Sequence, residues 1–436
     1  MSRLRLISIV CFIFVFSWMR MSGQQKLRLI PTFENCSYYC DSVFDVTFDK
    51  AWNTSDVFRL LYKAKNESQW CEAFPPYYDI QRFQLRGSIM NLKENTEYDV
   101  RLEKKRKNKW ITVKKGDFVT WNSCPPIKRE WKLSELKEYK AGSGVVLKGM
   151  KGRADGWIKI IGDVPIEVSS TYRQALEVDD CRYLILENFV VKGGKIDAVA
   201  IRENCENVRI VGADISAWGR VAVDQVHLED SINYPAVKYK RDNACFIDEE
   251  GVVIRNDAGI YLGTVGKVPG PKDIVVERCY IHDPNGHSNA WHGTREIGRA
   301  KGIPYRFWHP QGPQGIYMRS RGGLVIRYND VVGMDHHRLH DLLGGFNNGK
   351  IDGGMNTDAD VYGNYLAFSQ DDGLEMDGGQ CNIRLYNNRI EQVRVGISTA
   401  PNMKGPSYLI RNVIFNLFIQ AIASLPDEDN DYYREI

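Results

Sequence analysis

The stretch that decides the fold runs from Ala359 to Asn416 and reads ADVYGNYLAFSQDDGLEMDGGQCNIRLYNNRIEQVRVGISTAPNMKGPSYLIRNVIFN. In it an asparagine, one spacer and an aliphatic residue recur at Asn364–Leu366, Asn388–Ile390 and Asn412–Ile414, at intervals of 24 residues. A second short strand pattern, such as DGLEMDG or VGISTA, precedes each of these units by 13–15 residues. Two strands at fixed positions in one period are typical of a solenoid whose coils stack on each other.

Weaker copies of the same unit lie earlier in the chain, in CRYLILENFVV (181–191), VERCYIHD (276–283) and GLVIRYNDVV (323–332). Asn329 precedes Asn364 by 35 residues, which is one period plus an insertion of eleven near HHRLHDLLGGF. No helical pattern separates the strands, which argues against βαβ units, and the LxxLxLxxN frame of leucine-rich repeats is missing. We therefore predict an all-β protein whose residues 127–436 form a right-handed parallel β-helix.

Residues 27–126 carry short alternating strands of the kind found in a small β-sandwich, and Cys124 and the two prolines after it read as a linker. The stretch MNLKENTEYDVRLE (90–103) resembles the fibronectin type III pattern, with Leu92, Thr96 and Tyr98 in its characteristic positions. The run EKKRKNKWITVKK (103–115) is basic. It is either the solvated face of a hairpin or a binding surface for an anionic glycan.

The first 23 residues have the features of a signal peptide. Arg3 and Arg5 precede an apolar run from Leu6 to Trp18, which is too short to span a bilayer. No later segment is apolar enough to cross a membrane, so we expect an exported protein, periplasmic or secreted. Nine of the ten cysteines follow this segment; four early ones could form two disulfides in an oxidising compartment, and the odd total leaves a thiol.

The composition is that of a globular protein, with 43% hydrophobic residues and a formal net charge of +3 in 436 residues. A length of this size allows one large and one small domain. A charge so close to zero gives no electrostatic case for binding nucleic acid, whose phosphates require a strongly basic face.

Strand alternation places several acids on one outer strip of the predicted β-helix. The inward aliphatics of the second strands set their register: Ile260, Ile316, Ile351, Leu374 and Ile397. The residues that then point outward form two columns. The first contains Tyr261, Tyr317, Asp352, Glu375 and Ser398, and the second contains Gly263, Arg319, Gly354, Asp377 and Ala400. Asp352 and Glu375 would be neighbours roughly 5 Å apart, with Asp377 about 7 Å away.

Two carboxylates so close cannot both ionise freely, and a pair with one protonated member can cleave glycosides by the retaining route. Three oxygens on one strip could instead hold calcium. We interpret Asp371 and Asp372 as turn-capping residues.

Seven of the eight histidines lie between His282 and His340, in loops longer than a solenoid turn requires. We predict that His337, His340, Trp308 and His309 contact a sugar, together with Asp377, Arg319 and Tyr317. Nearby aromatic residues could equally pin these loops to the body.

The repeats, the signal peptide and DDGLEMDGG (371–379) resemble the β-helix carbohydrate-active enzymes that polysaccharide-degrading bacteria export. Closest in arrangement is the retaining β-xylosidase family, in which an Asp nucleophile and a Glu acid/base lie one coil apart; β-helix α-L-fucosidases are another relation. The resemblance implies that Asp352 is the nucleophile and Glu375 the acid/base of a monomeric glycoside hydrolase without a metal. Outside these two carboxylates there is no clear match.

Two other functions remain open. A polysaccharide lyase would use Arg319, Lys350, Arg394 or His337 as base or as the group that neutralises a uronate, with calcium at Asp352, Glu375 and Asp377. The vWiDH and RxPxxR stretches of pectate lyases are not evident. A glycan-binding protein without activity would need no close acid pair.

Overall fold

The computed structural model describes residues 27–41, 57–221, 224–227, 244–247, 250, 254, 257–264, 270–288, 312–335 and 337–417. The predicted signal peptide, Trp308 and His309 lie outside them. The chain divides into two compact units, Met1–Asn122 and Ser123–Ile436. Within the described ranges, no helix is long and apolar enough to cross a membrane.

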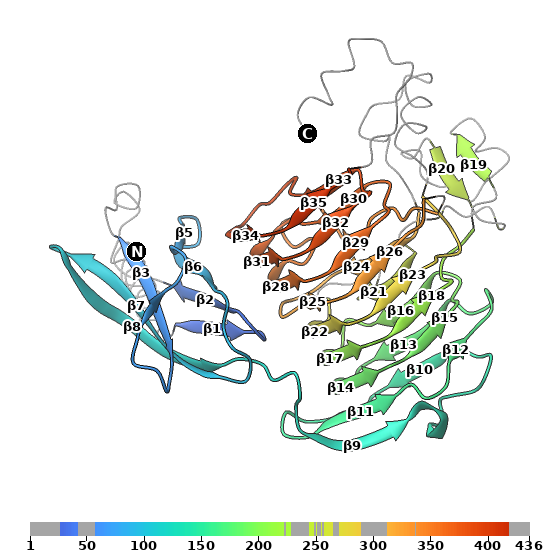
Figure 1. Ribbon diagram of the computed structural model, residues 1–436, viewed down its shortest axis with the longest axis horizontal. Coiled ribbons are helices and arrows are strands. Elements are labelled where there is room, and N and C mark those ends of the chain that lie inside the picture. The colour runs from blue at the N-terminus through green and yellow to red at the C-terminus, as the bar shows by residue number, and fades with distance from the viewer. Residues whose placement is uncertain are drawn as a thin grey trace, which may run out of the picture. The chain divides into compact units, whose positions relative to one another are not determined.

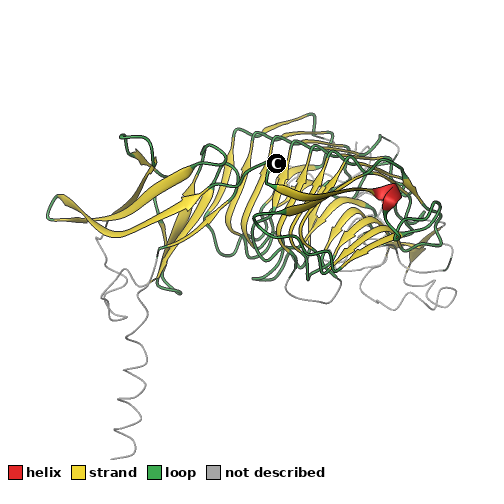
Figure 2. Ribbon diagram, turned by 90° about the horizontal axis from the view of Figure 1, so that it is seen from below, coloured by secondary structure: helices red, strands yellow, loops and turns green. Residues whose placement is uncertain are grey.

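The second unit is a right-handed parallel β-helix, as predicted, and its coils follow one another along three parallel sheets (Figures 1 and 2). Sheet I contains β10 (Val145–Lys148), β13 (Gln174–Asp179), β16 (Asp197–Ile201), β21 (Ala258–Leu262), β24 (Gln314–Met318), β27 (Leu343–Gly345), β30 (Asp372–Glu375) and β33 (Val395–Ser398). Sheet II contains β9 (Ile127–Lys132), β11 (Trp157–Ile161), β14 (Arg182–Glu187), β17 (Glu206–Val211), β22 (Lys272–Glu277), β25 (Val325–Arg327), β28 (Thr357–Tyr362), β31 (Cys381–Tyr386) and β34 (Ser407–Ile410). Sheet III contains β12 (Ile166–Glu167), β15 (Val190–Lys192), β18 (Asp214–Ser216), β23 (Tyr280–His282), β26 (Asp330–Val332), β29 (Tyr365–Ala367), β32 (Arg389–Glu391) and β35 (Val413–Phe415). A short 3-10 helix (Leu133–Glu135) and the antiparallel pair β19 (Asp224–His227) and β20 (Ala244–Ile247) complete the elements.

The interior is a continuous stack of aliphatic side chains. In sheet I, Ile260, Ile316, Leu343 and Leu374 pair in register from coil to coil, and each is fully buried. Each such side chain contributes about 1.5–3 kcal/mol through its removal from water. The pairing of these buried side chains in register is therefore what holds the coils in line, although the loops between them differ in length.

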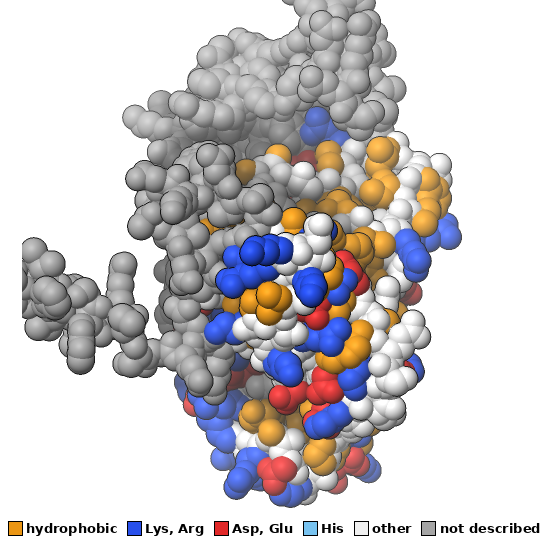
Figure 3. Space-filling view, turned by 90° about the vertical axis from the view of Figure 1, so that its left-hand side faces the viewer, with side chains coloured by type: hydrophobic (Ala, Val, Ile, Leu, Met, Phe, Trp, Pro, Cys, Tyr) orange, Lys and Arg blue, Asp and Glu red, His pale blue; other side chains and the backbone are white. Residues whose placement is uncertain are grey.

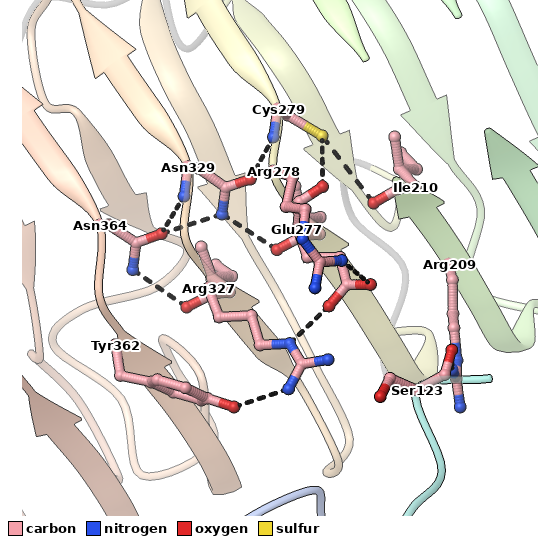
Figure 4. A network of polar contacts seen from close by, with 12 residues as sticks. Ser123, Arg209, Ile210, Glu277, Arg278, Cys279, Arg327, Asn329, Tyr362 and Asn364 are labelled. Carbon is pink, nitrogen blue, oxygen red and sulfur yellow. Dashed lines mark hydrogen bonds and ion pairs between the residues drawn. The ribbon is translucent and has the colours of Figure 1, made fainter. Parts of the chain in front are cut away.

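An asparagine ladder explains the recurrence at 24 residues. Asn329, Asn364, Asn388 and Asn412 stack at the turn between sheets II and III, and each side-chain amide donates to Oδ1 of the next at 2.9 Å. The same Oδ1 atoms accept backbone N–H groups of the preceding coil, and Cys279 begins the series by donating its N–H to Asn329 (Figure 4). The ladder satisfies backbone groups that a tight turn would otherwise bury without a partner.

Strict alternation fails in sheet I, where two consecutive residues face the core. A Cβ on Gly373 would meet Ile390 Cγ2 at 2.5 Å, and Leu374 beside it is also part of the core. Leu342 and Leu343 are both core residues in the coil before. Residues three positions apart therefore share the outer side of this sheet.

The predicted register is wrong at one coil. Leu343, not Ile351, pairs with Ile316 and Leu374, and Gly344 stands opposite Tyr317. The eleven inserted residues are split around β27. The segment from Val331 to Leu343 is four residues longer than the equivalent segment of the next coil, Leu366 to Leu374. The segment from Leu343 to Ala359 is seven residues longer than its equivalent, Leu374 to Ile383.

The first unit consists of two four-stranded antiparallel sheets with an apolar core. One contains β1 (Arg28–Pro31), β2 (Cys36–Asp41), β6 (Gln84–Ile89) and β5 (Tyr77–Asp79), and the other β4 (Cys71–Glu72), β3 (Phe58–Ala64), β7 (Glu97–Arg106) and β8 (Lys109–Val119). The hydroxyl of Tyr98 accepts a hydrogen bond from the backbone N–H of Lys93 at 2.8 Å, the contact that a tyrosine corner makes in sandwich domains. The two disulfides expected among the early cysteines are not formed. The residues that remain as thiols are Cys36, Cys40, Cys71 and Cys124.

A buried carboxylate cluster as the candidate active site

Carboxyl groups from two neighbouring coils meet on the outer side of sheet I. One oxygen each from Asp341, Asp372 and Glu375 lie within 4.8 Å of one another. Asp341 also belongs to a second trio, in which one ligand atom each from His340, Asp341 and Asp371 lie within the same distance. Every member of the two trios is buried, with at most 7% of its surface exposed.

The departure from strict alternation brings these acids together. Asp341 and Gly344 flank the core residues of β27, and Asp372 and Glu375 flank those of β30. Because Gly344 has no side chain, the carboxamide of the buried Gln314 occupies the space that a Cβ at this position would take, beside Asp341. A Cβ at Gly344 would lie 3.1 Å from Asp341 Oδ2.

Hydrogen bonds hold the carboxylates in place. Asp341 Oδ1 accepts the backbone N–H of Asp372 at 3.1 Å, which links the two coils at this point. Glu375 Oε2 accepts the N–H of Gly345 at 2.5 Å, and its Oε1 accepts Asn348 Nδ2 at 2.6 Å. Both oxygens of Glu375 are therefore acceptors, an arrangement that favours the ionised form.

His340 lies between two of the acids. Its Nδ1 is 3.6 Å from Asp341 Oδ2, and its Nε2 is 3.7 Å from Asp371 Oδ2. His337, predicted alongside it, instead packs its ring against His287 at a centroid distance of 5.5 Å.

Burial sets the protonation of the cluster. It raises the pKa of Asp341, Asp372 and Glu375 well above the ordinary carboxyl values, and the neighbouring carboxylates raise them further. Burial also raises the pKa of Asp377, although Ser398 Oγ and the N–H of Ala400 donate to its Oδ1 at 2.8 and 2.6 Å. Without a cation, the cluster therefore retains protons at pH values at which exposed carboxyls have lost theirs.

An aromatic and cationic wall adjoins the cluster. Tyr317 lies against Tyr261 at 5.1 Å and meets Phe346 edge-on at 6.1 Å. The Arg319 guanidinium lies 4.2 Å from the centre of the Phe346 ring, and its Nη1 donates to the carbonyl of Thr264 at 3.1 Å. Burial raises the pKa of Tyr317 well above its usual value, so this hydroxyl stays protonated.

Asp352 is not where the alternation argument put it. It lies in an exposed turn after Ile351 and belongs to no strand. The outer position next to Glu375, where Asp352 was expected, is occupied by Gly344 of β27.

Asp341 was not identified from the sequence, and Asp371 and Asp372 were interpreted as turn caps. A signal for Asp341 and Asp372 was present: DLLG (341–344), DGLE (372–375) and QGIY (314–317) share one frame, in which a polar residue precedes two core positions.

Comparison with known proteins gives no family. No protein-family model and no curated protein matches the chain. Among solved structures, the crystal structure of pectate lyase Pel9A is similar over 67% of this chain and 70% of that chain, with a TM-score of 0.32 and 6% sequence identity. So distant a likeness assigns no family and no activity.

Proposed function

We propose that the protein is a polysaccharide-cleaving enzyme that acts on a uronate-containing glycan by β-elimination, with a calcium ion at the carboxylate cluster. The observation that carries the proposal is the convergence of Asp341, Asp372 and Glu375 within 4.8 Å.

The donor set fits calcium. Calcium binds oxygen ligands at about 2.3–2.6 Å, so ligands on opposite sides of the ion are about 5 Å apart, close to the separation in this cluster. Carboxylates are hard donors, and the described part of the cluster offers no thiolate that would favour zinc. A buried group of acids is costly unless protons or a cation neutralise it.

In a β-elimination, calcium would neutralise the uronate carboxylate and acidify the neighbouring C–H. Arg319, fixed over Phe346, would bind a second anionic group of the substrate. Lys350 is exposed on the same loop as Asn348, which donates to Glu375, so it is our candidate for the base that removes the proton. The C–O bond to the leaving sugar would break as the C=C bond of the unsaturated uronate forms, and Tyr317, protonated beside Glu375, would donate a proton to the leaving oxygen.

A retaining glycoside hydrolase is the second candidate. The raised pKa values favour it, because a general acid must keep its proton near neutral pH. Glu375 would be the acid/base, and Asp341 or Asp372 would replace Asp352 as its partner. One feature makes this candidate weaker: both oxygens of Glu375 accept hydrogen bonds, which favours the ionised form over that of a general acid.

The test compares products and metal dependence. Purified protein is incubated with polygalacturonate, with alginate and with neutral xylan, each with calcium and with a chelator. We expect a chelator-sensitive rise in the ultraviolet absorbance of unsaturated uronate. Reducing ends without that absorbance would support the hydrolase, and binding without any cleavage would leave a glycan-binding protein. Asp341→Asn and Glu375→Gln should abolish the reaction, while Asp352→Asn serves as the matched control.

Three further assignments are part of the proposal. The order of strands in the first unit, together with the Tyr98 contact, supports a fibronectin type III-like module. The first 23 residues support export, and we expect the exported protein to be a monomer.

A further inference from the structure

The tip of the β7–β8 hairpin concentrates positive charge. Seven basic residues and no acidic one lie between positions 104 and 115. Four of them stand exposed around the two-residue turn: Lys105, Arg106, Lys107 and Lys109. Figure 3 shows Lys and Arg side chains at the surface, with acidic side chains among them.

Several of these cations stand opposite one another on the two strands of the hairpin. Arg106 stands directly opposite Lys109, and Arg101 directly opposite Lys115. Like charges in opposite positions destabilise a hairpin by a few tenths of a kcal/mol or about 1 kcal/mol per pair. A hairpin that needed only to be soluble would gain stability from pairs of opposite sign. A polyanion bound at the tip would reduce the repulsion between Arg106 and Lys109, whereas Arg101 is already paired with Glu103.

Two guanidinium groups beside the tip are held in fixed positions. Arg59 lies 4.2 Å from the ring centre of Trp110, and Arg101 lies 4.3 Å from that of Trp70. Glu103, which is buried, pairs with both arginines, at 2.8 and 2.9 Å. Planar donors that are already ordered lose little entropy when they bind a carboxylate.

We infer that the β7–β8 hairpin and the adjoining face of β3 form a binding surface for a carboxylate-bearing polysaccharide. The choice of a uronate polymer rests on the proposed function, because this surface would then hold the polymer whose backbone the β-helix cleaves. Two binding sites in one chain raise the effective concentration of a long polymer at the second site.

Nucleic acid fits this surface less well. Proteins that bind single strands offer open aromatic faces for the bases, whereas Arg59 and Arg101 cover a face of Trp110 and Trp70. The basic patch is also short, because two acidic residues, Asp99 and Asp117, stand opposite each other further along the same two strands.

The experiment uses the full chain in native gels that contain polygalacturonate, dextran sulfate, neutral dextran or duplex DNA. The variant R106Q/K107Q/K109Q removes three charges from the tip. Its control, K65Q/R82Q/K93Q, removes three charges from cations at least half exposed elsewhere on the same unit. We expect the tip variant to bind polygalacturonate at least tenfold more weakly, with a shallower dependence on salt, and the control to bind like the parent protein.

A second variant separates binding from folding. Arg106→Glu turns the pair with Lys109 into one of opposite sign, so it should raise the melting temperature slightly while polygalacturonate binding falls. Equal binding by tip variant and parent would overturn the inference, as would DNA binding as tight as polysaccharide binding. Preference for dextran sulfate over polygalacturonate would overturn the choice of carboxylates. If no polymer is cleaved but the gels give the expected result, the proposed function fails and the binding surface stands.

Discussion

Asp341 and Glu375 belong to neighbouring coils, yet one carboxylate oxygen of each lies within 4.8 Å of the other and of one from Asp372. The contact exists because β27 and β30 each turn two successive residues into the core and so bring their flanking residues to the same outer side. Both catalytic proposals for this protein, elimination and hydrolysis, depend on that contact.

Calcium should stabilise the protein. An ion that binds only the folded state adds about 2.7 kcal/mol when its concentration is a hundred times the dissociation constant, which for a unit of this size corresponds to a melting temperature roughly 4 °C higher. Differential scanning calorimetry with calcium and with a chelator measures the shift. Asp341→Asn should abolish it and Asp352→Asn should not; a shift that survives Asp341→Asn would place the ion elsewhere.

Substitution of the two acids predicted from the sequence should have opposite outcomes. Glu375→Gln removes a carboxylate from the cluster and should lower kcat/KM by roughly a hundredfold or more. Asp352→Asn changes an exposed turn residue and should leave kcat/KM within about twofold of the parent value. Initial rates on the polymer that the screen identifies provide the measurement. Comparable losses of kcat/KM in both variants would support the pairing of Asp352 with Glu375 that the sequence suggested.

Asp197 should make stability depend on pH. Its burial raises its pKa to about 7, although Gln174 Nε2 and the N–H of Ala258 both donate to it at 3.2 Å. The folded state then holds this proton more tightly than the unfolded chain does. The contribution of Asp197 to stability should therefore be greatest below about pH 4 and fall as the pH rises to about 7, by on the order of 4 kcal/mol.

Asp197→Asn should remove this slope, because an amide does not ionise. Urea unfolding at several pH values, in the presence of calcium so that the cluster stays neutralised, gives the comparison. An unchanged slope in the variant would show that Asp197 ionises normally in the folded protein.

The asparagine ladder should be most sensitive at its centre. Asn364→Ala removes the acceptor of the buried backbone N–H of Asn329 and the side-chain donor to the carbonyl of Ile326, and should lower the free energy of unfolding by roughly 3 kcal/mol. Asn412→Ala, at the partly buried end, should cost about 1 kcal/mol. Equal losses in chemical denaturation would mean that the ladder does not act through burial.

The positions expected from the sequence agree with the structure for residues next to a clear repeat and differ from it beside the insertion. Glu375, His340, Arg319 and Tyr317 were identified, and the structure brings them to one region. Two segments near the insertion, LLGG and KIDGGM, fit the strand pattern about equally well. Choosing the second placed Asp352 on the strip and left Asp341 unnoticed.

The sequence by itself determined the solenoid, because the spacing of asparagines and aliphatic residues reports directly on which groups must stack to satisfy the turns and fill the core. Only the tertiary structure decided which acids meet. The position of β27 depends on the pairing of Leu343 with Ile316 and Leu374, contacts between coils that decide between two segments with similar local patterns. The outer side shared by Asp372 and Glu375 depends on Gly373 packing against Ile390, because that contact overrides the two-residue alternation of an ordinary strand.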